Sequence, residues 1–250
     1  MLYSVKKVHL IGIGGIGMSG IAELLKNKEF SISGSDIVDS PIIERLINLG
    51  INVSIGHNKE NISDAELVIY SDAIPENNVE LIEAYSKNIL VYSRAKMISE
   101  IAKLNNSTVA IAGTHGKTTT TSMVGTILKS MNLDPTIIVG GVIKSLESNS
   151  ILGAGDTLVV EADEYNKSLL HLSPTIAVIN NIDFEHIECY KDIDDLKDTF
   201  LQFANSVPFY GTVCVCKDSE NVASIIPKID KRIVTSVSYT HLRAHETAID

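Results

Sequence analysis

A glycine-containing segment near the middle of the chain has the residue types and spacing of a phosphate-binding loop. Residues 110–120 read AIAGTHGKTTT, with apolar residues before them and a helical apolar spacing from Thr118 to Met131. A strand, a loop and a helix start are therefore expected. The first amides of a helix attract anions, so a polyphosphate would bind the loop amides while Lys117 reaches its β and γ phosphates. The expected ATP-binding residues are Gly113, Thr114, His115, Gly116, Lys117, Thr118 and Thr119.

This segment departs from the general phosphate-loop pattern at one position. The full pattern has a glycine five positions before Gly116, where this chain has Ile111. The alternative interpretation is a strand-to-helix turn that carries a surface lysine. The flanking strand and helix favour phosphate binding, and Thr118 would then offer a hydroxyl to Mg²⁺.

A second glycine loop lies near the N-terminus. Residues 12–17 read GIGGIG, which satisfies Gly-x-Gly-x-x-Gly between an expected strand and an expected helix. Asp36 ends the next strand, near the position of a ribose-binding acid, although it could instead cap a helix. This pattern alone also fits an NAD-dependent oxidoreductase, which is the alternative function. Hydride transfer needs no triphosphate loop, whereas a ligase with a nucleotide-linked substrate needs two phosphate sites.

Acidic residues and a histidine follow two further apolar strands. Glu161, Asp163 and Glu164 come after the first, at the edge where open α/β sheets bind ligands, and carboxylate oxygens suit Mg²⁺. A solvated acidic turn is the alternative. His186 follows the second strand and could bind a cation, but a lone histidine is more often an ordinary loop residue.

Strand-like and helix-like segments alternate along the whole chain, which predicts the α/β class with parallel sheets. We expect a Rossmann-like domain over residues 1–105 and a partial central ATP-binding domain of the P-loop type over residues 106–236. Residues 237–250 show no clear period and are interpreted as a non-native tail. The expected strands are 8–13, 30–33, 52–55, 67–70, 89–92, a strand from Val109, 136–139, 157–160, 176–180, 212–216 and 232–235.

Composition narrows the class of protein. The 250 residues are 44% hydrophobic and 21% charged, as in a globular protein with a sizeable core. A net charge of −10 without a basic run argues against nucleic acid as a partner. No apolar run approaches the roughly 18 residues of a membrane span, and the N-terminus does not resemble a signal peptide. We expect a cytoplasmic protein without membrane insertion.

Together the segments resemble the Mur ligases, from about Val8 to Thr235. The motifs are residues 12–18, 113–120, 161–164, 180–183 with His186, and 207–211. The resemblance implies a Rossmann-like domain for a UDP-sugar and a central ATPase domain that is incomplete here. A third domain, which closes over the site and helps to bind the amino acid, would be absent. Such a fragment is expected to bind substrates without forming product.

The closest resemblance is to members that join L-alanine to UDP-N-acetylmuramate for peptidoglycan synthesis, forming ADP through an acyl phosphate. A family member that joins a different amino acid remains an alternative. The resemblance gives catalytic roles to Lys117, Glu161 and His186. It implies that Thr118 and Glu161 hold Mg²⁺ and that His186 serves a second cation. The UDP part would contact Gly14, Gly15, Gly17 and Asp36.

Overall fold

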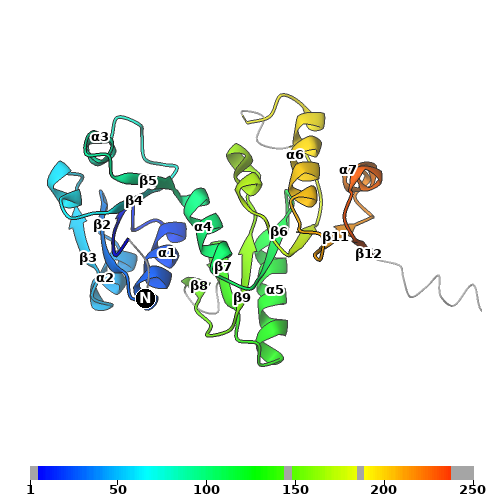
Figure 1. Ribbon diagram of the computed structural model, residues 1–250, viewed down its shortest axis with the longest axis horizontal. Helices are drawn as coiled ribbons and strands as arrows, with labels where there is room; N and C mark the ends of the chain where they lie inside the picture. The colour runs from blue at the N-terminus through cyan, green and yellow to red at the C-terminus, as the bar shows by residue number, and fades with distance from the viewer. Residues whose placement is uncertain (1–4, 144–147, 185–188, 238–250) are drawn as a thin grey trace, which may run out of the picture. The chain divides into compact units, whose positions relative to one another are not determined.

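The computed structural model of the chain describes residues 5–143, 148–184 and 189–237 (Figure 1). The chain divides into two compact units, residues 1–101 with 138–152 and residues 102–137 with 153–250. The domain boundaries expected from the sequence remain predictions.

The first unit contains a five-stranded parallel sheet in the order β3-β2-β1-β4-β5. Its elements are β1 (Lys7–Ile11), α1 (Ile16–Asn27), β2 (Ser31–Asp36), α2 (Pro41–Asn48), β3 (Asn52–Ile55), η1 (Lys59–Ile62), β4 (Leu67–Tyr70), α3 (Val79–Ser86), β5 (Leu90–Ser93) and α4 (Arg94–Lys103). Strand β1 is central, and the order reverses beside it. Such a reversal opens a crevice at the carboxyl ends of the strands, which is where the first glycine loop lies.

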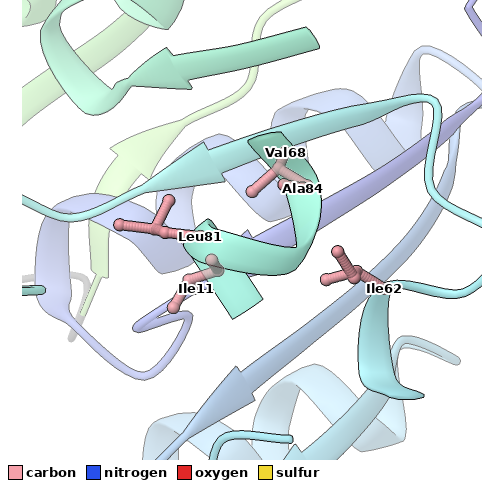
Figure 2. Close-up of a cluster of buried hydrophobic side chains, with 5 residues drawn as sticks. All are labelled: Ile11, Ile62, Val68, Leu81 and Ala84. Atoms are coloured by element: carbon pink, nitrogen blue, oxygen red, sulfur yellow. The ribbon is translucent and has the colours of Figure 1, made fainter. Parts of the chain in front are cut away.

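Helices and short turns cover both faces of this sheet. Helix α1 contacts α2, and α3 contacts η1. Strand crossovers are right-handed. The chain moves along the sheet in one direction from β1 to β3 and in the opposite direction from β3 to β5, so these two pairs cover opposite faces. Figure 2 shows the core beneath α3 and η1, built from Ile11, Ile62, Val68, Leu81 and Ala84.

The chain also forms a seven-stranded sheet in the order β12-β11-β10-β6-β9-β7-β8. The elements after α4 are β6 (Ser107–Ala112), α5 (Lys117–Ser130), β7 (Thr136–Ile143), β8 (Ser148–Ile151), β9 (Thr157–Glu161), η2 (Tyr165–His171), β10 (Ile176–Ile179), α6 (Ile193–Asn205), β11 (Thr212–Cys216), α7 (Glu220–Ile225), η3 (Ile226–Lys228) and β12 (Ile233–Ser236). Strand β6 lies between β10 and β9 and is parallel to both. The carboxyl ends of these three strands therefore meet at one edge.

The α/β class predicted from the sequence is confirmed. Strands β3, β4 and β11 have the predicted bounds, whereas α3, α7 and β8 were not predicted. The second helix forms as its sequence indicates, because Ser40 caps it by accepting a hydrogen bond from the amide of Ile43 and Pro41 occupies its first position. No helix within the described ranges is long and apolar enough to cross a membrane.

Candidate functional site

The predicted phosphate loop connects β6 to α5, at the edge where three strands end. Two glycines give the loop its shape: Gly113 has φ 142° and Gly116 has φ 78°. Both values favour glycine, because a side chain is strained there. A Cβ at Gly113 would also lie 3.0 Å from the Cβ of Asn180. The loop is thus packed closely against the segment that follows β10.

That segment, residues 180–183, holds the loop through paired hydrogen bonds. The amide of His115 donates to Oδ1 of Asn181 over 2.8 Å, and Nδ2 of Asn181 donates back to the His115 carbonyl over 3.1 Å. The Thr114 hydroxyl donates to the Asp183 carbonyl and accepts from the Asp183 amide, at 3.1 and 2.8 Å. The structure therefore brings together two motifs that are 66 to 69 residues apart in the sequence.

The starts of α5 and α1 differ from those of the other long helices with a described cap. Ser40, Asn78 and Asp192 cap α2, α3 and α6 with their side chains. Helices α5 and α1 begin after Gly116 and Gly15, and among the described residues no side chain caps either helix. An uncapped helix start leaves backbone amides to bind an anion. Both predicted phosphate sites therefore lie at uncapped helix starts; among the described residues the short helix α7 also begins without a side-chain cap.

Lys117, the first residue of α5, is folded back onto the loop. Its Nζ lies 2.7 Å from the carbonyl oxygen of Gly113 and 3.3 Å from that of Thr114. It also lies 3.0 and 2.7 Å from Oε1 and Oε2 of Glu164. The Lys117 side chain is 17% exposed and that of Glu164 only 2%. The ammonium is therefore paired with a buried carboxylate.

The structure describes only some of the residues that were predicted to hold metal ions. Glu161 is half-buried at the end of β9, in register with Ile111 of β6, and Thr118 is half-buried in the first turn of α5. His186 lies outside the described residues. Within the part of the chain that the structure describes, no three His, Cys, Asp or Glu side chains form a metal-binding group. Hydroxyl and carboxylate oxygens are nevertheless the ligands that Mg²⁺ prefers.

The first glycine loop is hydrogen-bonded to the end of β2. The Ser35 carbonyl accepts hydrogen bonds from the amides of Gly12 and Ile13, at 2.8 and 3.0 Å. The Asp36 carboxylate accepts one from the Gly14 amide at 2.9 Å. A Cβ at Gly14 would lie 2.9 Å from that carboxylate. The structure therefore places Asp36 beside the loop, as a ribose-binding acid would be.

Ser35 is itself held by a buried polar network around Glu80 of α3, whose side chain is fully buried. Ser35 Oγ and Asn61 Nδ2 each donate to the Glu80 carboxylate at 2.6 Å. His57 Nδ1 lies 3.2 Å and His9 Nε2 lies 3.7 Å from Oε2 of Glu80. Burial alone would raise the pKa of Glu80, but these hydrogen bonds hold it at about 2. An ionised carboxylate thus fixes the strand end that carries the glycine loop.

Two charged residues that lie at the loops were not predicted to have individual roles. Glu164 appeared only within the acidic segment. Arg94 begins α4, and its Nη1 lies 2.8 Å from the position that a Cβ on Gly17 would take. Both residues follow closely on the end of a parallel strand, the position where ligand-binding side chains of such sheets lie.

Comparison with known proteins identifies the family of both halves of the chain. The Mur ligase family catalytic domain matches residues 7–106, and the Mur ligase middle domain matches residues 111–249. A UDP-N-acetylmuramate–L-alanine ligase of Sulfurihydrogenibium sp. (strain YO3AOP1) is 51% identical over 92% of this chain and 50% of its own length. The chain spans about half the length of the curated relatives that it matches.

Two solved structures show the same fold. The UDP-N-acetylmuramate-alanine ligase of Thermotoga maritima has a TM-score of 0.80 and 29% identity, over 92% of this chain and 52% of that one. The UDP-N-acetylmuramate:L-alanyl-gamma-D-glutamyl-meso-diaminopimelate ligase of Neisseria meningitides has a TM-score of 0.82 and 27% identity. It is matched over 93% of this chain and 78% of its own. The family resemblance found in the sequence is confirmed: this chain belongs to the Mur ligase family.

Proposed function

We propose that this chain carries the UDP-sugar and ATP sites of an ADP-forming ligase that joins L-alanine to the carboxylate of UDP-N-acetylmuramate. The observation that carries the proposal is the pair of glycine loops, each followed by an uncapped helix start and only one of which has a lysine. The choice of L-alanine follows the name of relatives that are about 50% identical to this chain.

At the loop before α5, Lys117 and the loop amides would bind the β and γ phosphates of ATP. Phosphoryl transfer needs mainly positioning and neutralisation of the phosphate charge, which these groups supply. The expected ATP contacts are Gly113, Thr114, His115, Gly116, Lys117, Thr118 and Thr119. Thr118 and Glu161 would hold Mg²⁺, with His186 near a second cation, and the bound metal would neutralise phosphate charge.

At the loop before α1, Gly14, Gly15 and Gly17 would contact the diphosphate of the UDP-sugar. Asp36 would accept a hydrogen bond from the ribose. Arg94 adds a cation beside Gly17, where a diphosphate at the start of α1 would lie.

The proposed reaction has two steps. An oxygen of the substrate carboxylate attacks the γ-phosphorus of ATP, the bond from that phosphorus to the bridging oxygen breaks, and ADP leaves. The amine of L-alanine then attacks the acyl carbon of the acyl phosphate. Inorganic phosphate departs and the amine loses a proton, so an amide, ADP and phosphate are the products.

Calorimetric titration of the 250-residue chain tests this proposal. We expect saturable binding of MgATP and of UDP-N-acetylmuramate, with MgATP binding lost in Lys117→Ala and UDP-N-acetylmuramate binding retained. Tight binding of NADH without affinity for either ligand would instead support an oxidoreductase. Because the relatives are about twice as long, we expect binding without turnover. Alanine-dependent phosphate release by this chain would contradict that expectation.

A further inference from the structure

The ion pair between Lys117 and Glu164 uses the group that the proposed function assigns to ATP. A lysine ammonium has three N–H donors. Here the Glu164 carboxylate and the carbonyls of Gly113 and Thr114 surround it within 2.7 to 3.3 Å. The donors are therefore already engaged. Lys117 cannot reach a phosphate without giving up some of these partners.

The turn that carries Glu164 is held in a conformation that its residues disfavour. Asn166 and Lys167 have φ of 51° and 56°, in the left-handed region that non-glycine residues rarely adopt. Two consecutive residues of this kind are disfavoured in a chain of L-amino acids. Such a turn persists only where its surroundings fix it.

Four contacts fix this turn. The Tyr190 hydroxyl donates to the Glu164 carbonyl, and burial raises the pKa of this phenol, so it remains a donor. Lys167 Nζ lies 2.7 Å from Oδ1 of Asp195 and 5.4 Å from the centre of the Tyr190 ring. The amide of Leu169 donates to the Asp163 carbonyl over 2.8 Å. Together they hold the Glu164 carboxylate at the phosphate loop.

We propose that Glu164 is a resting counter-ion that competes with the nucleotide triphosphate for Lys117. In the chain without nucleotide, Glu164 neutralises the lysine and keeps it against the loop carbonyls. ATP binding transfers the ammonium from the carboxylate to the phosphates, so part of the nucleotide's binding energy is used to break the ion pair. This inference rests on the proposed function of the loop.

The proposal makes a prediction opposite to that for a carboxylate that helps to bind MgATP. Glu164→Gln keeps the shape of the side chain but removes its charge, so Lys117 is held less tightly before the nucleotide arrives. Hydrogen bonds to charged groups contribute about 1.5–3 kcal/mol, so MgATP should bind roughly tenfold or more tightly to Glu164→Gln. Glu164→Asp keeps the charge on a shorter side chain, and its affinity should lie between the two.

Glu220→Gln is the matched control. Glu220 is exposed at the start of α7. The side chain of its neighbour Asn221 donates to the carbonyl of Ile182, which belongs to the segment that holds the phosphate loop. The same substitution there removes one negative charge from this edge of the sheet without touching Lys117. Its MgATP affinity should stay within about twofold of that of the wild type. A gain equal to that of Glu164→Gln would mean that charge on the whole edge, and not the ion pair, sets the affinity.

The experiment is calorimetric titration of MgATP into the wild type and the Glu164→Gln, Glu164→Asp, Glu220→Gln and Lys117→Ala variants, with circular dichroism to confirm folding. Tighter binding by Glu164→Gln supports the proposal. Equal or weaker binding, with wild-type binding that Lys117→Ala abolishes, overturns the competition and leaves the nucleotide site intact. If neither the wild type nor folded Glu164→Gln binds MgATP, the proposed function fails as well.

Discussion

The buried carboxylate of Glu80 gives a stability prediction whose size can be worked out from the structure. Its pKa falls from an ordinary value of 4.5 to about 2, because His9, 3.7 Å away, and the hydrogen bonds from Ser35 and Asn61 outweigh the effect of burial. Each pKa unit corresponds to about 1.4 kcal/mol, so the ionised side chain contributes roughly 3 kcal/mol to the free energy of unfolding. The contribution is complete above pH 4.5 and is lost as the pH falls toward 2. By pH 3, about 2 kcal/mol of it should be gone.

Comparison of the wild type with Glu80→Gln isolates this contribution. The difference between their unfolding free energies should shrink by about 2 kcal/mol from pH 6 to pH 3, because only the wild type has the titrating group. Urea unfolding followed by circular dichroism measures the difference, and amide hydrogen exchange in β2 and α3 assigns it to the first unit. The control is Glu83→Gln in the same helix. Glu83 pairs with Lys87 over 3.0 Å and is partly exposed, so its replacement should have little effect at either pH.

A difference between wild type and Glu80→Gln that stays constant from pH 6 to pH 3 would refute this reasoning. Glu80 would then have the same pKa in the folded and the unfolded protein. A wild type that becomes more stable relative to Glu80→Gln as the pH falls would mean instead that Glu80 is neutral when folded. Either result would mean that the network around Glu80 does not favour the ionised carboxylate.

Three further predictions concern packing and the two loops. Leu81→Ala removes a side chain that is 3% exposed in the core of Figure 2 and should cost about 2–5 kcal/mol in urea unfolding, whereas Ile82→Ala, 54% exposed, should cost far less. Gly14→Ala should displace the Asp36 carboxylate, 2.9 Å from the new Cβ, and weaken UDP-N-acetylmuramate binding roughly tenfold in calorimetry. Gly116→Ala places a side chain at φ 78°, which costs about 1–2 kcal/mol, so MgATP affinity should fall about tenfold. Unchanged affinity in either glycine variant would contradict the loop geometry.

Strands and helices were predicted correctly where the local sequence pattern determines the local structure. Continuous apolar runs predicted the buried strands, and the glycines after β1 and β6 predicted the turns into helices. Helix α3 was not predicted, because one of its buried positions is Glu80, which breaks the apolar pattern of its inward face. The start of α3 carried a usable signal, since Asn78 caps it through bonds to the amides of Glu80 and Leu81.

The sites were only partly predictable, for a different reason. The glycine loops could be found because their residues are adjacent in the sequence. Lys117 and Glu164 are 47 residues apart, and Glu80 meets Ser35 across 45, so the fold alone brings each pair together. His9 and His57 likewise lie beside Glu80, across a large separation in the sequence. The roles of Glu161, Thr118 and His186 stay predictions.

The central claim is that the chain holds two separate nucleotide sites, each at a glycine loop. Amide NMR spectra of the isotope-labelled chain, recorded during titration with a magnesium complex of a non-hydrolysable ATP analogue and then with UDP-N-acetylmuramate, test it most directly. The ATP analogue should shift the amides of residues 113–119 and leave residues 12–17 unchanged, and the UDP-sugar should do the reverse. Shifts at residues 12–17 with the ATP analogue, or none at residues 113–119, would contradict the claim.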